Sequence, residues 1–308
     1  MKKLMVFAPM TVGNMGCGFD VLGMAMDGTG DVLEMAVGEG SSISIENESN
    51  VSLPDDIEKN VITPAIRSFL LKYGKQLSVK VKVLKKILPG SGIGSSAASS
   101  AAAVFALNEL TGRPFSGKQL VEFAMDGEKL ISGSRHADNV APALLGGVVL
   151  VRQNEPLDIV SLPVPDNFYC AAVHPHITVT TREGRSVLPQ QIPLHDAITQ
   201  WGNVGSLVAG LALGDMQLVG RSIKDVVAEP YRKRFIPQFD ELKQSLMQAG
   251  ALAASISGSG PSVFAVSDSM AAAEKLTKVM KQHFAALGIE SDVYASKVSA
   301  TGARVING

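Results

Sequence analysis

A glycine loop between two regular elements constrains this chain more than any other segment. The loop reads Leu88-Pro89-Gly90-Ser91-Gly92-Ile93-Gly94-Ser95-Ser96-Ala97-Ala98. Before it, residues 77–87 alternate valine with lysine, which predicts a half-buried strand. After it, residues 95–110 have the small residues and apolar spacing of a buried helix. Glycines let the backbone approach a ligand closely, and the N–H groups of a helix start favour an anion. The segment therefore predicts a phosphate-binding loop, with Ser95 and Ser96 at the start of the helix.

The loop does not match two common phosphate-binding motifs. A Walker loop needs Lys directly after its last Gly, but Ser95 stands there, and Lys85 and Lys86 precede the loop. A dinucleotide fingerprint needs the spacing G-x-G-x-x-G with an acidic residue about 20 positions on. Here the spacing is G-x-G-x-G, and the nearest acidic residue at that offset is Glu109, at a helix end. Taken alone, the loop also fits a turn that uses glycine for its geometry.

Two more motifs help to decide between a phosphate-binding loop and a structural turn. One is the N-terminal segment Ala8–Asp20, and the other is Ser257–Ala265, which contains Gly-Ser-Gly-Pro-Ser. With the central Pro-x-x-x-Gly-x-Gly-Ser-Ser-Ala, they resemble the three motifs of the GHMP small-molecule kinases, in the same order. Within that family the chain resembles the homoserine kinases, on residues 14–20, 127–142, 185–189 and 229–232. Thr11-Val12-Gly13 and Ile93 depart slightly from the usual pattern.

Composition agrees with a globular enzyme and excludes other classes. The 308 residues are 46% hydrophobic and 19% charged, which is unlike a disordered chain. Lys+Arg 28 against Asp+Glu 29 gives a net charge of -1, so there is no basic field for nucleic acid or an anionic membrane. No apolar run approaches the roughly 20 residues that span a bilayer. Two cysteines do not make a disulfide framework, which favours a reducing cytoplasm.

The chain divides at a proline-rich stretch. Pro156, Pro163 and Pro165 lie within residues 153–166, the predicted boundary between two halves. Helix and strand patterns alternate without strict β-α-β order, which predicts α+β layers. The resemblance implies a two-domain GHMP kinase fold. Its N-terminal domain, residues 1–155, would carry the ATP-binding loop and resemble ribosomal protein S5 domain 2. Residues 156–308 would form a ferredoxin-like C-terminal domain.

Individual elements can be placed from the pattern. Ser116 with Gln119 predicts a capping box at the start of a helix, on which Leu120, Ala124 and Glu128 share one face. The pattern also predicts strands near residues 146–151, 169–174 and 291–298, helices near 196–213, 216–227, 239–249 and 270–287, and a hairpin around 258–261.

The resemblance implies phosphoryl transfer from ATP, assisted by Mg²⁺, to a small alcohol. Mg²⁺ prefers hard oxygen ligands, and Glu128 and Ser96 match the metal ligands of the family. Without the resemblance, Glu128 is a helix-end carboxylate and Ser96 a helix cap. Asn60 matches the position that contacts adenine, although a turn asparagine would look the same. The glycine loop, residues 88–98, matches the nucleotide-binding loop.

The same resemblance implies that the acceptor is L-homoserine, phosphorylated to O-phospho-L-homoserine in threonine biosynthesis. A carboxylate calls for the planar fork of arginine, and Arg185 and Arg232 match the positions that bind it, with Arg234 as a close alternative. The remaining pocket positions are matched by Asn14, Asp20, His136, Asn139 and Thr181. Asp20 would act as a catalytic partner of the hydroxyl, as a base or as a positioning group. A homodimer, a GHMP kinase for another small alcohol and a catalytically silent sensor all stay open.

Overall fold

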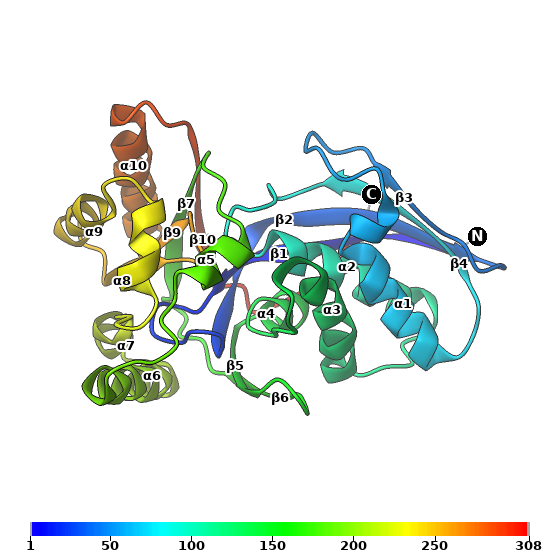
Figure 1. Cartoon of the computed structure of the whole chain (residues 1–308), viewed down its shortest axis with the longest axis horizontal. Helices are drawn as coiled ribbons and strands as arrows, with labels where there is room; N and C mark the ends of the chain where they lie inside the picture. Colours follow the sequence, from blue (N-terminus) through cyan, green and yellow to red (C-terminus); the bar gives the residue numbers. More distant parts are fainter. Residues whose placement is uncertain (1, 307–308) are drawn as a thin grey trace.

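The computed structural model describes residues 2–306 and contains two β-sheets with helices packed against them (Figure 1). The larger sheet has the order β11-β1-β2-β4-β3, and β5 pairs with the other end of β2 and with β6. Strand β2 is long enough to pair with β4 near one end and with β5 near the other. The strands are β1 (Lys2–Gly13), β2 (Leu22–Gly38), β3 (Ile43–Asn47), β4 (Ser78–Lys85), β5 (Val148–Gln153), β6 (Asp158–Leu162) and β11 (Arg304–Ile306).

Four helices and a short 3-10 helix pack with this sheet. They are η1 (Ile57–Lys59), α1 (Ile62–Tyr73), α2 (Ser95–Leu110), α3 (Gly117–Ser132) and α4 (Val140–Leu145). Helix α2 is buried on nearly all sides, because its alanines and serines let β1, β2, α1 and α3 approach it closely. The capping box between Ser116 and Gln119 is confirmed. The predicted bounds of α2 are confirmed as well.

The smaller sheet is antiparallel, with the order β10-β7-β9-β8. Its strands are β7 (Tyr169–Pro175), β8 (Ala253–Ile256), β9 (Val263–Ser267) and β10 (Ser291–Lys297). The helices of this half are α5 (Thr181–Ser186), α6 (Leu194–Leu213), α7 (Met216–Ser222), α8 (Glu229–Arg232), η2 (Lys233–Phe235), α9 (Phe239–Gln248) and α10 (Met270–Ala286). Phe239, Leu242, Met280 and Phe284 of α9 and α10 share a buried apolar cluster with this sheet. Two sheets with helices packed on them confirm the α+β class.

Several features differ from the sequence pattern. The predicted helix over residues 216–227 ends at Ser222, because the carboxylate of Asp225 accepts hydrogen bonds from the N–H groups of Val227, Ala228 and Glu229, where α8 begins. Helix α1 and strand β11 were not expected from the pattern.

The chain passes between the two sheets in the segment that joins β6 to β7, residues 163–168. Strand β6 lies inside the proline-rich stretch but pairs with β5, and β11 returns the end of the chain to β1. The division into residues 1–155 and 156–308 stays a prediction. Within residues 2–306, no helix combines the length and the apolar character needed to cross a membrane.

Candidate active site

The three sequence motifs meet at the glycine loop. The N–H of Thr11 donates to the carbonyl of Ile93 (3.2 Å), and the N–H of Gly258 donates to that of Gly13 (3.1 Å). The hydroxyl of Ser257 donates to the carbonyl of Gly92 (2.8 Å). Segments far apart in the sequence therefore form one polar junction at the start of α2.

The glycines of the loop are required by their conformation and by this junction. Gly92 and Gly94 have φ of +78° and +72°, a region that residues with a Cβ rarely adopt. A Cβ at Gly94 would collide with Thr11, and one at Gly92 would lie 2.5 Å from the carbonyl oxygen of Gly260. The contacts that exclude a side chain here are thus made by the protein itself. Gly92 and Gly94 are therefore required by the fold as well as by any close approach of a phosphate.

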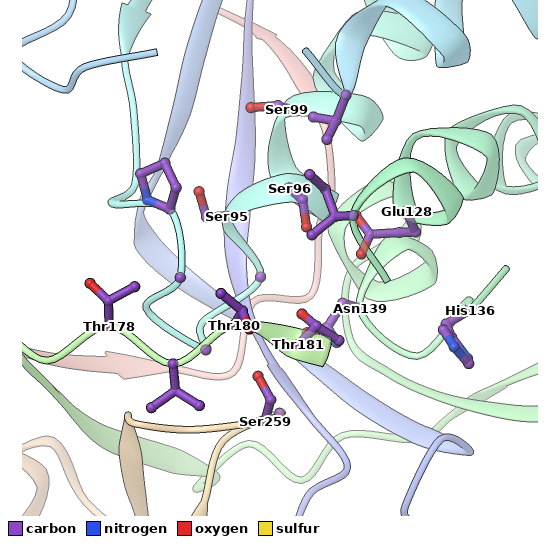
Figure 2. A pocket seen from close by; sticks show the side chains of 18 of the residues that line it. Ser95, Ser96, Ser99, Glu128, His136, Asn139, Thr178, Thr180, Thr181 and Ser259 are labelled. Carbon is purple, nitrogen blue, oxygen red and sulfur yellow. The ribbon is translucent and has the colours of Figure 1, made fainter. Parts of the chain in front are cut away.

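A cavity of about 380 Å³ opens at this junction. Figure 2 shows that its labelled side chains come from α2, α3, the segment between α3 and α4, the start of α5 with the segment before it, and the third motif. Most of the predicted site residues line it: Asn14, Asp20, Asn60, Pro89, Gly90, Gly92, Gly94, Ser95, Ser96, Glu128, His136, Asn139, Thr181, Arg185 and Arg232. Leu88, Ser91, Ile93, Ala97 and Ala98 are not among the described residues that line it, and the last three lie in the apolar core.

Glu128 and Ser96 lie together on this cavity, at the facing ends of α3 and α2 (Figure 2). The carboxylate oxygen Oε1 of Glu128 is buried. Burial raises the pKa of Glu128 to about 7, although a hydrogen bond from Ser96 and the charge of Lys86 act in the opposite direction. A buried carboxylate beside a hydroxyl offers the hard oxygen ligands that Mg²⁺ prefers, and a cation there would relieve the cost of ionisation.

A buried ion pair contacts the residues on either side of the glycine loop. The ammonium of Lys86 lies 3.1 Å from the carboxylate of Asp31, and their side chains are 5% and 0% exposed. Lys86 also donates to the Ser95 carbonyl (2.8 Å), and Asp31 accepts from the N–H of Ile87 (2.8 Å) and the hydroxyl of Ser99 (2.5 Å). Burial lowers the pKa of Lys86, and Asp31 opposes that shift. Lys86 lines the cavity, so the network presents a positive charge beside the helix start.

This pair gives a stability prediction. Replacing Lys86 with alanine should lower the free energy of unfolding by about 3–5 kcal/mol, because it leaves the Asp31 charge buried without its counter-ion. Asp31 keeps its hydrogen bonds from Ile87 and Ser99 in this variant, so we expect a loss of stability near the lower end of that range. Urea unfolding measures the loss, with the exposed neighbour variant Lys85→Ala as control. An unchanged unfolding midpoint for Lys86→Ala would contradict this account of the pair.

The other end of the cavity carries charged groups around Asp20. Nη2 of Arg185 donates to both oxygens of the Asp20 carboxylate, at 2.7 and 2.9 Å. Nδ1 of His136 lies 3.8 Å from the same carboxylate. Burial lowers the pKa of His136, while the charge of Asp20 raises it. Asp20 has φ of +60°, and its N–H donates to the side-chain oxygen of Asn14 (3.0 Å), so the first motif holds the carboxylate in an unusual turn.

Arg232, and not Arg234, is the second arginine of the cavity. Arg232 is 3% exposed, and it donates to the carbonyls of Gly184 (3.0 Å) and Gly258 (2.7 Å). Its guanidinium lies over the ring of Phe19, 5.0 Å from the centroid, and that of Arg185 lies over the same ring at 5.5 Å. Arg234 is exposed and bonds to the carbonyl of Tyr231 (3.0 Å), outside the described residues that line the cavity.

Several cavity residues were not predicted as site residues. Asp138 accepts a hydrogen bond from Asn139 (3.1 Å), and Asn139 accepts one from Thr11 (2.8 Å). Burial, and then the charges of Asp20 and Glu128, raise the pKa of Asp138 to about 7. Lys86, Thr178 and Thr180 also line the cavity. Thr180 caps α5 in a capping box with Glu183, a signal that could have been found from the spacing.

Comparison with known proteins agrees with this arrangement. The model of the GHMP kinases N terminal domain matches residues 60–147, and that of the GHMP kinases C terminal matches residues 207–286. The chain belongs to the GHMP kinase family. Homoserine kinase from Chlorobium phaeobacteroides (strain BS1) is 45% identical over 99% of this chain and 100% of its own length. Homoserine kinase from Chlorobium phaeovibrioides is 46% identical with the same coverage.

A solved structure of the family is also close to this fold. The crystal structure of homoserine kinase from Cytophaga hutchinsonii superposes with a TM-score of 0.94 at 48% identity, over 99% of this chain and 98% of that one. Likeness to members of the family that are named homoserine kinase therefore extends over nearly the whole length, including both sheets and the segments around the cavity.

Proposed function

We propose that the chain is a homoserine kinase, which transfers the γ-phosphoryl group of ATP to the side-chain hydroxyl of L-homoserine. The product is O-phospho-L-homoserine, in threonine biosynthesis. The observation that carries the proposal is one cavity with a glycine loop at one end and Arg185, Arg232 and Asp20 at the other. Full-length relatives named homoserine kinase support the choice of substrate. An anion-binding helix start and an acceptor pocket on one cavity are what a kinase needs.

At the nucleotide end, the loop and the start of α2 would hold the phosphates. Lys86 adds a positive charge there, and Leu53, Pro54, Val61 and Ile131 give the same cavity apolar surface for a base. Glu128 and Ser96 would hold Mg²⁺, because a buried carboxylate and a hydroxyl match its preferred ligands. The bound ion would neutralise charge on the transferring phosphoryl group.

At the acceptor end, the charges fit an amino acid. The guanidinium groups of Arg185 and Arg232 would bind the carboxylate of homoserine, and Asp20, with Asn14 and Asn139, would receive its amino and hydroxyl groups. His136 and Thr181 complete this end of the cavity. Phosphoryl transfer through a loose transition state asks little of a base, so holding the hydroxyl in line can suffice. Asp20 is therefore proposed first as a positioning partner of the hydroxyl.

A substrate screen tests the proposal. ADP release would be measured with homoserine, mevalonate, galactose and shikimate at saturating ATP and Mg²⁺. Homoserine should give the highest kcat/KM by a wide margin. Preference for another alcohol would indicate a different kinase of the family. Binding of ATP and homoserine without any ADP release would indicate a sensor, although Ser95, Ser96 and Glu128 all face the cavity as a kinase requires.

We also propose a cytoplasmic homodimer. Cys17 and Cys170 are both free and buried, in keeping with a reducing compartment. On α6, Leu194, Ile198 and Trp201 are 68, 56 and 64% exposed along one face. No charged residue occurs between Ala197 and Gly214, so this face would meet a second copy of itself without like-charge repulsion.

The dimer gives a further prediction. Trp201→Glu places a charge on the α6 face and should reduce the mass measured by analytical ultracentrifugation from that of a dimer to that of a monomer. Leu71→Glu is the matched control, since Leu71 is 86% exposed on α1, away from this face. A native protein that sediments as a monomer, or a Trp201→Glu variant that stays dimeric, would refute this interface.

A further inference from the structure

A second cluster of ligand-type side chains lies in the smaller sheet, outside the cavity. His174 on β7 and Asp292 on β10 are directly opposite one another in the strand register. His176 follows His174 by two positions, directly after the end of β7. One ring nitrogen of each histidine and one carboxylate oxygen of Asp292 lie within 4.8 Å of one another. None of these three is among the described residues that line the cavity.

The buried member of the cluster has an unused nitrogen. His174 is only 5% exposed, and its Nδ1 has no hydrogen bond of good geometry among the described residues. Burial lowers the pKa of its imidazole, while the charge of Asp292 and a contact with the backbone of Ile177 oppose that shift. An unsatisfied buried polar atom is uncommon and costly, so its presence asks for a reason. A metal ion bound at the cluster would give this buried imidazole a further polar partner.

The exposed histidine has a carboxylate near each of its ring nitrogens. Nε2 of His176 lies 2.9 Å from a carboxylate oxygen of Asp292, and its Nδ1 lies 3.5 Å from the carboxylate of Glu290. A histidine that binds a metal through one nitrogen commonly donates from the other to a carboxylate, which fixes its tautomer and ring orientation. Nε2 of His176 faces Asp292 and the cluster, and Nδ1 faces the exposed Glu290. Nε2 is therefore placed to bind a metal, and Nδ1 is placed to interact with a carboxylate outside the cluster.

We propose that His174, His176 and Asp292 bind a divalent transition-metal ion of the zinc class, with Glu290 orienting His176 from outside. Two imidazoles and one carboxylate are ligands that suit Zn²⁺, and a water molecule would complete the coordination. The chemistry differs from that of the oxygen ligands Glu128 and Ser96, which suit Mg²⁺.

The position of this cluster suggests what the ion would do. It would tie the end of β7 to the start of β10. From there the chain runs on from His176 to Thr178 and Thr180, which line the cavity. An ion that binds only the folded state stabilises it in proportion to its occupancy. Zn²⁺ should therefore raise the melting temperature of the protein and anchor the segment that leads to the active site.

Direct metal titration tests the proposal. Metal-free protein would be titrated with Zn²⁺ by calorimetry and with Co²⁺ by visible absorption, and a crystal soaked in Zn²⁺ would be examined for anomalous scattering. We expect one site between His174, His176 and Asp292. His176→Ala and Asp292→Asn change half-exposed side chains, which limits the risk of misfolding. Each should weaken binding by more than the roughly 10–100-fold that loss of an outer-shell partner costs.

Two control variants make the outcome decisive. His195→Ala removes an exposed histidine that lies 3.0 Å from Asp196 and belongs to neither cluster of metal-ligand side chains among the described residues, so it should leave Zn²⁺ affinity unchanged. His136→Ala removes a member of the Asp20, His136 and Asp138 group in the cavity, and it should also leave the tight site intact. Loss of binding in His136→Ala but not in His176→Ala would overturn the proposal, as would the absence of any zinc signal at the cluster.

Discussion

Replacing Glu128 with glutamine should reduce kcat by at least about 100-fold, with the protein still folded. Loss of one group that stabilises charge in the transition state costs roughly 10²–10³ in rate. Glutamine keeps the shape of the side chain but removes the carboxylate proposed to hold Mg²⁺ with Ser96. The measurement is ADP release at saturating ATP, homoserine and Mg²⁺. Near-normal turnover by a folded variant would count decisively against the metal assignment.

A control on the same helix separates this effect from a general change in charge. Glu122 lies on α3, and it is not among the described residues that line the cavity. Glu122→Gln also removes one negative charge and should leave kcat within about twofold of the native value, as for a typical substitution away from a site. An equal loss in both variants would show that α3 tolerates neither change and that position 128 is not special.

Glu128→Gln should raise the stability of the protein although it lowers activity. The pKa of Glu128 is raised from its ordinary value of 4.5 to about 7 in the folded protein. The folded state therefore holds this proton more tightly than the unfolded chain does, and ionisation destabilises the fold as the pH rises from about 4.5 to about 7. Above pH 7 and without Mg²⁺, Glu128→Gln should recover up to about 3 kcal/mol. Urea unfolding at pH 5 and at pH 8 measures the difference in free energy of unfolding between the variant and the native protein. If the variant gains no more stability at pH 8 than at pH 5, the carboxylate of Glu128 is not buried as an unfavourable charge.

Local patterns in the sequence predicted the elements that depend on local interactions. The bounds of α2 follow from its small residues and from Gly94 before it, and the start of α3 follows from a capping box between neighbours in the chain. The end of α7 depends instead on Asp225, whose carboxylate also accepts from the side chain of Gln200 on α6. Strand β11 exists because the chain end returns to β1. The bond from Gln200 to Asp225 and the pairing of β11 with β1 join residues far apart in the sequence, so neither is visible from neighbours in the chain, whereas the backbone bonds from residues 227–229 to Asp225 are local.

The site was predicted from the sequence in the parts that the family motifs cover. The resemblance placed Asp20, Glu128 and Arg185 on one cavity although they lie far apart in the chain. It matched Arg232, at the end of the segment 229–232, and left Arg234 two positions on as an alternative. Only the packing of α8 buries Arg232 and leaves Arg234 exposed. Lys86 was seen merely as a lysine before the loop. Its partner Asp31 comes from the middle of β2, and only the folded sheet shows that pairing.

The second large effect concerns the choice of substrate. We expect Arg185→Ala and Arg232→Ala each to raise the KM for homoserine strongly, with little change in ATP binding. Losing one charge-assisted contact to a carboxylate costs about 1.5–3 kcal/mol, a factor of roughly ten to a few hundred in affinity. Arg185 still has capacity for this contact, because Asp20 engages only its Nη2.

The two arginines should differ in what else they change. Arg232 also bonds to the carbonyls of Gly184 and Gly258, so Arg232→Ala should lower stability as well. Arg185→Ala removes the counter-ion of Asp20 and should act mainly on the binding of the substrate.

A carboxylate-free analogue, 3-amino-1-propanol, separates an effect on substrate binding from an effect on the fold. It should be a poor substrate for the native enzyme, and it should lose less than homoserine does when either arginine is removed, because its binding does not use them. Equal losses for both compounds would mean that the arginines act through the fold or through phosphate. A native enzyme that prefers the carboxylate-free compound would remove the basis for assigning homoserine as the acceptor.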